Sequence, residues 1–585
     1  MSVRKSAAIA SLIIVAGGAL GACNDSNGPT APQRNCTGSS TPLALAVGAV
    51  HRLTTQELCA VTLDAGAGAE YVLVPFFASL TSSAHLQLDV LGENVGNVSG
   101  PPNPQVGPVH ATTTLAAHPG RISTASPRRD VQFDLQLRER ERRLLMAHAT
   151  SARAWFALRA GPDAPPRSGS PRPSRTLVTS GASVGDRVSV NVQANQDCTN
   201  PQLTTARVAA ITTHAIVLAD TANPSGGFSD TEYQAFGAQF DTLVHPLDTD
   251  AFGDPADIDN NDRVVILFTR AVNALTPANS DFFVGGFFFG RDLLPTAECP
   301  GSNLAEMFYM LVPDPTGTIN QNKRTKGFVD SLTAGTLVHE YQHLINASRR
   351  LYVNTGADPA EEVWLNEGLS HIAEGLAFFR ESGLSPRQNI DSATLRSSAR
   401  VVDAFNFFQS QNFARLLQYI DDPESTGPYR SDDNDDLNTR GATWEFLRYA
   451  ADRKATMDGT IWFDLVNSTT SGIANFENVF GADIRDWVAD FTVAQYADDA
   501  GLGVSSEFTL PTWNFREVFR QFDCCTKLPL TVTQLPNNTV KTTTLSGGGT
   551  AYFRFAEGGG DTSVGMTSQG QPVPTELRAV IVRTK

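Results

Sequence analysis

The chain has 585 residues, of which 41% are hydrophobic and 18% charged. At roughly 150 residues per domain, this length predicts several structural units, and the apolar content excludes a wholly disordered chain. The 45 Lys and Arg against 61 Asp and Glu give a formal net charge of −16. This balance argues against a nucleic-acid partner, because nucleic acids favour a basic surface.

The first residues have a pattern typical of export. Arg4 and Lys5 precede an apolar run over 7–20, which is shorter than the roughly 20 residues that span a bilayer but suits a secretory signal. The run ends in Leu-Gly-Ala-Cys at 20–23, which resembles the bacterial lipobox. We therefore predict a signal peptide over 1–22, a lipid anchor at Cys23 and a tether over 23–35. The alternative is an ordinary signal peptide with a chance cysteine.

These features predict a protein of the bacterial cell envelope, outside the cytoplasm, either periplasmic or on the cell surface. No later stretch approaches a membrane-spanning length, so the lipid would be the only membrane attachment. Six further cysteines in an exported chain favour disulfides, and the expected pairs are Cys36–Cys59 and Cys198–Cys299. The adjacent Cys524 and Cys525 bridge only with strain. Zinc binding by cysteines is the weaker alternative, because there is no Cys-x-x-Cys pair.

Composition divides the rest of the chain. Alternating apolar and polar residues predict β-rich modules over 36–117 and 506–585. Between them, 118–175 has twelve arginines against five acids and clustered prolines, which predicts a linker with one helix from Val131 to about Ala147. Its Arg-Glu-Arg-Glu-Arg-Arg run is most simply a solvated face. The alternative is a cleavable pro-segment that docks on the acidic body of the protein.

The region 176–505 has a mixed pattern of strands and helices. A Gly-x-Ser-x-Gly match at 181–185 precedes an alternating strand rather than a helix, so we discard it as a nucleophile motif. A capping box at 229–232 begins a helix, and strands are expected over 264–269, 282–289 and 306–312. Helices are expected over 403–420, 443–453 and 484–496. The predicted class is α+β.

One helix, from about Leu332 to Leu351, contains His339-Glu-Tyr-Gln-His343, an HExxH motif. Histidines at i and i+4 lie one turn apart on the same face, so both rings can reach one zinc ion. Glu340, rotated to the side, is placed to hold a proton rather than the metal. This arrangement suits metal-assisted hydrolysis with a carboxylate as general base.

A catalytic zinc site needs a third protein ligand, and Glu367 is our choice. Asp358-Pro-Ala-Glu361 has the pattern of a helix start, which would place Glu367 two turns into a second helix. The alternatives are two ordinary core histidines with a surface glutamate, or a zinc site that has lost hydrolytic activity.

The segments at 339–346 (HEYQHLIN), 364–375 (WLNEGLSHIAEG) and 254–268 (DPADIDNNDRVVILF) together resemble the hyicolysin-like family, within the gluzincin group of zinc metallopeptidases. The resemblance covers about residues 230–450. It implies a zincin-type domain over 176–505, in which a helical half closes over a sheet half with the cleft between them. It also implies a polypeptide substrate, zinc ligands at His339, His343 and Glu367, and Glu340 as general base.

The sequence departs from this pattern after the third ligand. Thermolysin-like members have an Asp four residues after the ligand Glu, where this chain has His371. Glu374 is a candidate for the same orienting role. Candidates for the side chain that stabilises the oxyanion are His371, Tyr429, Arg440 and Tyr449.

Two further features, an acidic loop and a Phe-rich strand, predict binding of an ion and of a peptide. Asp257, Asp259 and Asn261 have the spacing of a calcium loop, although the Gly and Glu of that pattern are missing; the acidic run 432–436 is more often a solvated loop. The Phe-rich strand 282–289, if it forms the sheet edge, is expected to pair with an extended peptide; otherwise its phenylalanines are core.

The sequence thus predicts an exported, lipid-anchored zinc endopeptidase with β-rich modules at both ends. The alternative is an inactive zinc-binding surface lipoprotein that binds protein or polymer.

Overall fold

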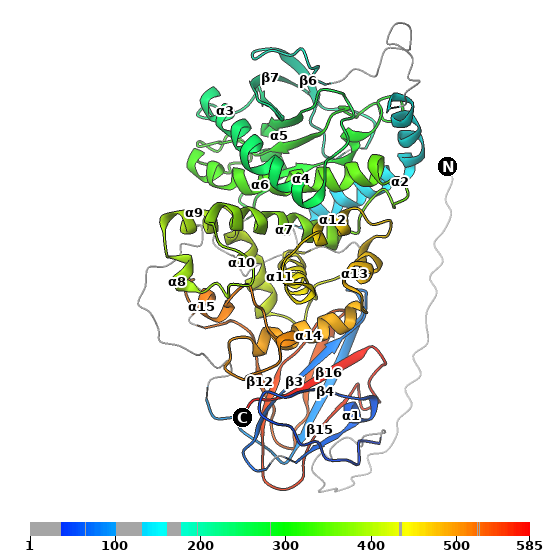
Figure 1. Cartoon of the computed structure of the whole chain (residues 1–585), viewed down its shortest axis with the longest axis vertical. Coiled ribbons are helices and arrows are strands. Elements are labelled where there is room, and N and C mark those ends of the chain that lie inside the picture. The colour runs from blue at the N-terminus through cyan, green and yellow to red at the C-terminus, as the bar shows by residue number, and fades with distance from the viewer. Residues whose placement is uncertain are drawn as a thin grey trace, which may run out of the picture.

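The computed structural model describes residues 37–64, 66–100, 131–160, 177–195, 197–280, 282–431, 436–522, 525 and 527–585. Figure 1 shows three tiers along the longest axis: a sheet with helices, a helical tier, and a β tier. The predicted α+β class is confirmed. The predicted signal peptide, the tether and Cys23 lie outside the described residues. Within the described ranges, no helix combines the length and apolarity needed to cross a bilayer.

The first tier is built on a six-stranded mixed sheet with the order β10-β11-β9-β8-β7-β6. Strands β8, β9 and β11 are parallel, and the other pairings are antiparallel. The strands are β6 (Arg187–Asn191), β7 (Leu203–Ile211), β8 (Ala215–Asp220), β9 (Val264–Phe268), β10 (Gly286–Phe288) and β11 (Met307–Met310). Strands β8, β9 and β11 are buried along their whole length, as expected for strands covered on both faces.

Strand β10 is an edge strand of this sheet, which is the condition set for peptide pairing, but it is shorter than the predicted 282–289. Phe282 and Phe283 precede it as loop residues. Phe287 and Phe288 are buried, and the ring of Phe287 stacks on that of Tyr309. The edge strand therefore also contributes to the core.

Four helices accompany this sheet: α3 (Asp230–Gln239), α4 (His245–Phe252), α5 (Arg270–Leu275) and α6 (Lys326–Ser348). The predicted capping box is present, because the Ser229 side chain accepts from Glu232 N and Glu232 accepts in return. Helix α6 begins earlier than the predicted Leu332, because the Thr325 side chain caps it. It then continues into a π-helical turn over Arg349–Val353.

Helix α2 (Val131–Ala160) is longer than predicted and is not simply a solvated face. Arg142 and Arg143 are exposed, but Leu137, Arg138 and Glu141 are buried. The physical reason is pairing: Arg138 Nη1 donates to Glu141 at 2.8 Å, and both side chains also bond to the first two tiers. The helix therefore packs on the body of the protein.

The helical tier contains α7 (Val363–Ser382), α8 (Ser392–Leu395), α9 (Ala399–Phe408), α10 (Ser410–Asp421), α11 (Leu437–Lys454), α12 (Ile461–Val466), α13 (Gly472–Phe480) and α14 (Ile484–Ala497). The single helix predicted over 403–420 is two helices that meet at Gln409.

Helix α7 begins after Glu362, which corrects the predicted start at Asp358. Glu361 is not a capping residue of that helix. Its buried carboxylate pairs with Arg350 and accepts from Gly472 N at 2.6 Å and Asn475 Nδ2 at 2.9 Å. This side chain instead links the π-helical turn to α13.

The β tier combines both ends of the chain. Its sheets have the orders β1-β16-β3-β14-β12, with β5 beside β14, and β13-β4-β15-β2. The N-terminal strands are β1 (Val50–Arg52), β2 (Val61–Leu63), β3 (Glu70–Phe77), β4 (His85–Glu93) and β5 (Val95–Gly96), with helix α1 (Thr55–Cys59) between β1 and β2. The C-terminal strands are β12 (Thr533–Gln534), β13 (Lys541–Ser546), β14 (Phe553–Glu557), β15 (Thr562–Thr567) and β16 (Leu577–Arg583).

The two β-rich ends, expected as separate modules, thus form one module with a shared core. Each end alone would leave strand edges unpaired. Residues 506–530 also differ from the expectation: Trp513 and α15 (Phe515–Phe519) pack into the core of the helical tier.

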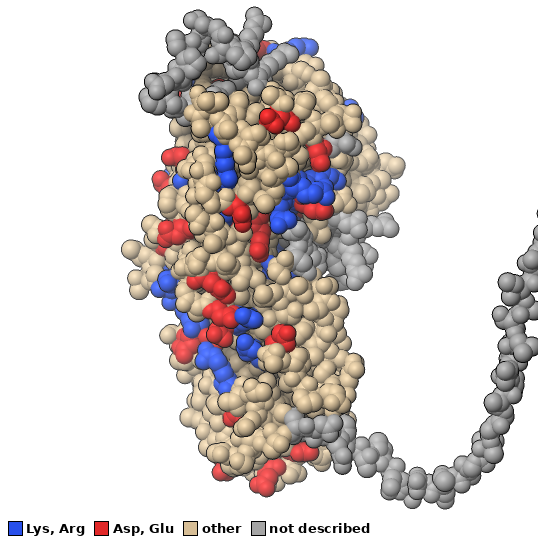
Figure 2. Space-filling view, turned by 90° about the vertical axis from the view of Figure 1, so that its right-hand side faces the viewer, with Lys and Arg blue, Asp and Glu red and all other residues tan. Residues whose placement is uncertain are grey.

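The predicted disulfide Cys198–Cys299 is present. Cys59 and Cys525 are also disulfide-bonded, whereas Cys36 and Cys524 lie outside the described residues. On the face shown in Figure 2, acidic and basic side chains are interspersed. The net negative charge is therefore not gathered into one acidic area on that face.

Candidate metal centre

Helix α6 places His339 and His343 on one face, as the i and i+4 spacing requires. Their Nε2 atoms lie 3.1 Å apart. The side chain of His343 is fully buried, and that of His339 is 12% exposed. Both rings therefore point at one small volume inside the protein.

Helix α7 brings Glu367 to the same volume. Its Oε2 lies 3.4 Å from His339 Nε2, and its Oε1 lies 3.5 Å from His343 Nε2. Metal–ligand bonds of 2.0–2.1 Å in a tetrahedron separate the ligand atoms by about 3.3 Å. The two ring nitrogens and the carboxylate oxygens of Glu367 thus have the separations of zinc ligands, and the residues present fit that ion.

A second layer of side chains orients the two rings. Glu374 Oε1 lies 2.8 Å from His339 Nδ1 and 3.3 Å from His371 Nδ1. Asn366 Oδ1 lies 3.1 Å from His343 Nδ1. A partner at Nδ1 fixes the tautomer that offers Nε2 to a metal. The carboxylate expected at position 371 is thus supplied by Glu374.

Two arginines flank Glu367. Arg138 Nε donates to Glu367 Oε1 at 3.0 Å, and Arg440 Nη1 lies 2.9 Å from Oε2. Burial alone raises the pKa of Glu367, but the charge of Arg440 and the hydrogen bonds to His339 and His343 lower it well below its usual range. Glu367 is therefore a carboxylate anion, the form that ligates a metal.

Burial also determines the protonation of neighbouring groups. It lowers the pKa of His343 to about 3, which keeps that ring neutral and able to ligate. It raises the pKa of Glu340 to about 7, against the opposing charge of His339. A carboxylate with a pKa near neutrality can both accept and release a proton.

The fold places two of the four candidates for stabilising the oxyanion near the donor residues and the other two away from them. Arg440 lies at the metal centre, and His371 is buried beside Glu374. Tyr449 is elsewhere, because its hydroxyl donates to Glu507 O at 2.6 Å. Tyr429 is buried near Asp483 and Arg485. Neither tyrosine contacts the three donor residues.

Sequence reasoning missed Asp134, Arg138 and Arg415. Asp134 lies 3.4 Å from Arg440, and Arg415 is a buried cation whose charge acts on Glu374. The available signal for Arg138 was its spacing to Glu141 at i and i+3, which marks a pair on one helix face. No sequence signal connects Arg415 to the site.

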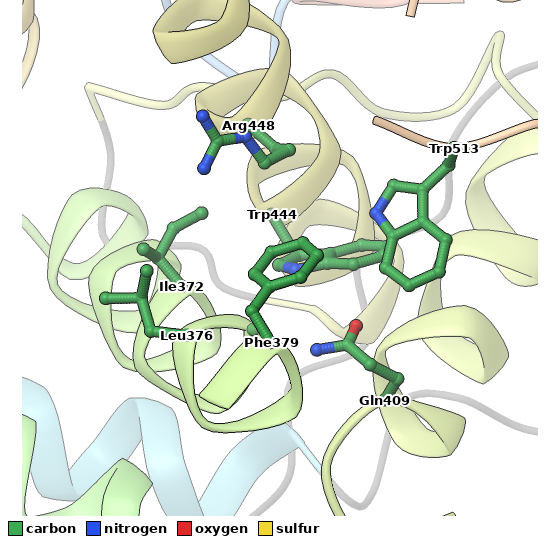
Figure 3. Close-up of a pocket in the computed structure, with 8 residues that line it drawn as sticks. Ile372, Leu376, Phe379, Gln409, Trp444, Arg448 and Trp513 are labelled. Atoms are coloured by element: carbon green, nitrogen blue, oxygen red, sulfur yellow. The ribbon is translucent and has the colours of Figure 1, made fainter. Parts of the chain in front are cut away.

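A separate small pocket lies between α7 and α11 (Figure 3) and does not belong to the metal centre. Its lining is mainly apolar and includes Ile372, Leu376, Phe379, Trp444 and Trp513. Of these, Ile372, Leu376 and Phe379 belong to α7, where they alternate with His371 and Glu374 around the helix. One face of α7 thus serves the donor residues and another packs against α11.

The residues of the predicted calcium loop are only partly brought together. Asp257 and Asp259 lie together, but Asn261 turns its Oδ1 to Arg263 N at 2.7 Å. The third member is Glu306, which precedes β11. Of the acidic run 432–436, Asp436 caps α11 by accepting from Thr439 N at 2.7 Å, and the rest lies outside the described residues.

Two histidines one turn apart, a glutamate from the next helix and a mixed sheet beside them define a zincin-type domain. No family model matches the chain. A segment of 146 residues, 25% of the chain, is 34% identical to the neutral metalloprotease ShpI of Staphylococcus hyicus. The match spans about a third (31%) of that relative's length. The resemblance to a hyicolysin-like metallopeptidase is therefore confirmed over a segment.

Proposed function

We propose that the protein is a zinc-dependent endopeptidase that hydrolyses peptide bonds. The observation that carries the proposal is the spacing of the donor atoms of three residues: 3.1 Å between the two histidine Nε2 atoms, 3.4 Å from His339 Nε2 to Glu367 Oε2, and 3.5 Å from His343 Nε2 to Glu367 Oε1. The similarity of a segment to a neutral metalloprotease supports it. The exported location and the lipid at Cys23 belong to the same proposal and depend on the sequence alone.

The roles of the residues follow from their positions. His339, His343 and Glu367 hold the zinc, which would polarise the scissile carbonyl and acidify a water molecule. Glu340 takes the proton of the attacking water and passes it to the leaving amine. Arg440 is the candidate to stabilise the developing oxyanion, because its guanidinium lies at the centre.

Strand β10 leaves room for this chemistry at Gly286. A Cβ atom at that position would lie 2.7 Å from Thr336 Cγ2 and 3.4 Å from Glu340 Cγ. Glycine therefore lets the edge strand approach the general base closely. The substrate backbone would lie along this strand.

The test separates metal binding from chemistry. Glu340→Gln should keep about one zinc per chain while hydrolysis of casein falls by about two to four powers of ten, the range for loss of a general base. His343→Ala and Glu367→Ala should lose the zinc itself, because each removes one of three protein ligands. Glu381→Gln is the matched control, since this exposed residue lies at the far end of α7.

Zinc content is measured by elemental analysis, and hydrolysis is measured with zinc present and after chelation. Hydrolysis by Glu340→Gln at the parent rate would refute the peptidase assignment. If the unsubstituted protein binds zinc stoichiometrically but never cleaves a polypeptide, even in variants that displace helix α2 from the metal centre, the binding-protein alternative is favoured.

A further inference from the structure

The acidic cluster beside β9 contains an unsatisfied buried carboxylate. Glu306 is 3% exposed, and its Oε2 has no hydrogen-bond partner among the residues that the structure describes. Its other oxygen accepts from Ile258 N. An unpaired buried carboxylate is costly, so Oε2 requires either a proton or a cation.

Two aspartates point to the same place. Ligand oxygens of Asp257, Asp259 and Glu306 lie within 4.8 Å of one another. Asp259 is buried and is held by Asn261, whose Nδ2 donates to it at 2.7 Å. Asp257 is exposed and completes the group from the surface side.

The fold creates this group from distant parts of the chain. Strands β9 and β11 pair in parallel, with Met307 opposite Val265. This register brings Glu306 beside the loop that precedes β9. The loop is also attached to the end of α6, because Ala256 N donates to Ser348 Oγ at 2.9 Å. A cation here would therefore fix the loop, the sheet and the active-site helix together.

We propose that Asp257, Asp259 and Glu306 bind one calcium ion. Three carboxylates, two from the loop before β9 and one from the residue before β11, suit a hard cation that accepts a flexible set of oxygen ligands. The site is independent of the proposed zinc centre, so it can exist whether or not the protein is a peptidase.

Calcium titration calorimetry and thermal unfolding of the full chain test the proposal. The parent should bind one calcium ion and unfold at a higher temperature with calcium present. Glu306→Gln and Asp259→Asn should each weaken binding at least tenfold. Asp262→Asn, an exposed residue of the same loop, should bind calcium as the parent does.

Absence of calcium binding by the parent at millimolar concentration would overturn the proposal. Parent-like affinity in both Glu306→Gln and Asp259→Asn would also overturn it, since calcium would then bind elsewhere. If Glu306→Gln does not fold, Asp259→Asn still decides between the outcomes.

A second inference concerns helix α2, which covers the metal centre. Arg138 contacts Glu367, and Asp134 contacts Arg440. With α2 in place, the side chains of His343 and Glu367 are at most 1% exposed, and Glu340 is 5% exposed. A polypeptide substrate cannot reach donor groups that are this deeply covered.

The same helix binds the open edge of β10. Arg138 Nη1 donates to Phe288 O at 3.3 Å, and Glu141 Oε1 accepts from Gly290 N at 2.8 Å. Phe133 packs edge-on against Phe287. An extended peptide that paired with this edge would use the same backbone groups. Helix α2 therefore occupies the place of the substrate.

The buried charged side chains of α2 find their partners where the helix covers the metal centre and β10. Arg138 and Glu141 are buried, and burying such charges is costly unless each has partners. Those partners come from Glu367, Phe288 and Gly290. Arg142 and Arg143 are exposed.

The geometry points to α2 as an intramolecular inhibitor that blocks the site until it is displaced or removed. This inference depends on the proposed function, because it regulates that site. It also gives the pro-segment alternative for 118–175 a physical basis in the contacts of Arg138 and Glu141.

The test compares full-length variants of α2. Leu137→Asp places a charge on a fully buried position and should release the helix. Met146→Asp makes the same kind of change at a position that is 52% exposed and is the matched control. Arg138→Gln, with Arg142→Gln as its control, is a milder pair that guards against misfolding.

Two quantities are measured: kcat/KM for a peptide substrate, and the affinity of the zinc-loaded protein for a peptide hydroxamate by calorimetry. Leu137→Asp and Arg138→Gln should raise both at least tenfold, and the controls should raise neither. Increased hydroxamate affinity without hydrolysis would support inhibition but contradict the peptidase assignment. Unchanged or reduced values of both quantities in folded, zinc-loaded variants would overturn the inhibitory role.

Discussion

Glu374 offers a sharp test of how the protein tunes its metal centre. It does not reach the donor volume itself, but its Oε1 lies 2.8 Å from His339 Nδ1. Burial raises its pKa, but the nearby His371 and His339 lower it well below its usual range, so it is charged. We therefore expect Glu374→Gln to weaken zinc binding without removing a ligand.

The magnitude follows from the geometry. Both histidine contacts use the same oxygen, Oε1, so a glutamine can keep an acceptor in place and lose only the charge. A charge-assisted hydrogen bond is worth about 1 to 1.5 kcal/mol more than a neutral one, which corresponds to about tenfold in Kd. Glu374→Ala loses the acceptor as well and should approach about 100-fold.

The assay is competition for zinc against a fluorescent chelator, with the unfolding temperature measured in parallel. Glu381→Gln, on the same helix but exposed, should leave the zinc affinity unchanged. A parent-like zinc affinity in Glu374→Gln would refute the reasoning, because the 2.8 Å contact would then contribute nothing to the metal site. A loss of stability equal in the apo and zinc-loaded states would indicate a purely structural role.

Three further predictions concern stability and location. Burial raises the pKa of Glu445 to about 8 from its ordinary value of 4.5, so the folded state loses stability as pH rises from 4.5 to 8. Glu445→Gln should therefore raise the free energy of unfolding, measured with urea, by about 3 kcal/mol at pH 7 and by almost nothing at pH 4. A Cβ at Gly441 would lie 2.4 Å from the backbone of Arg415 and Leu416, so Gly441→Ala should destabilise by about 1 to 3 kcal/mol; an unchanged unfolding midpoint would contradict this. Cys23→Ala should abolish membrane association in fractionated cells, because the lipid would be the sole anchor; unchanged association without lipid at Cys23 by mass spectrometry would exclude the anchor.

Much of the metal centre could be predicted because its information is local. The i, i+4 spacing of His339 and His343 fixes their shared face once a helix forms. Glu374 was a candidate because it lies two turns from Glu367 on the same helix. The capping box at Ser229 was correct for the same reason, since it depends on four consecutive residues.

Expectations that relied on contacts between distant segments were less complete. Glu306 replaces Asn261 in the acidic cluster because the parallel pairing of β9 and β11 brings it there. Tyr429 and Tyr449 had the right chemistry for the oxyanion but lie elsewhere. Sequence spacing gives no measure of such distances.

The sequence by itself determined the residue types of the metal centre, the α+β class and the Cys198–Cys299 pair. The tertiary structure alone decided that the two β-rich ends form one module and that α2 lies on the metal centre. The physical reason is that a helix pattern or an alternating strand specifies which face is buried. The partner that buries it is chosen by complementary surfaces far away in the chain, as Arg138 shows by pairing with Glu367 across 229 residues.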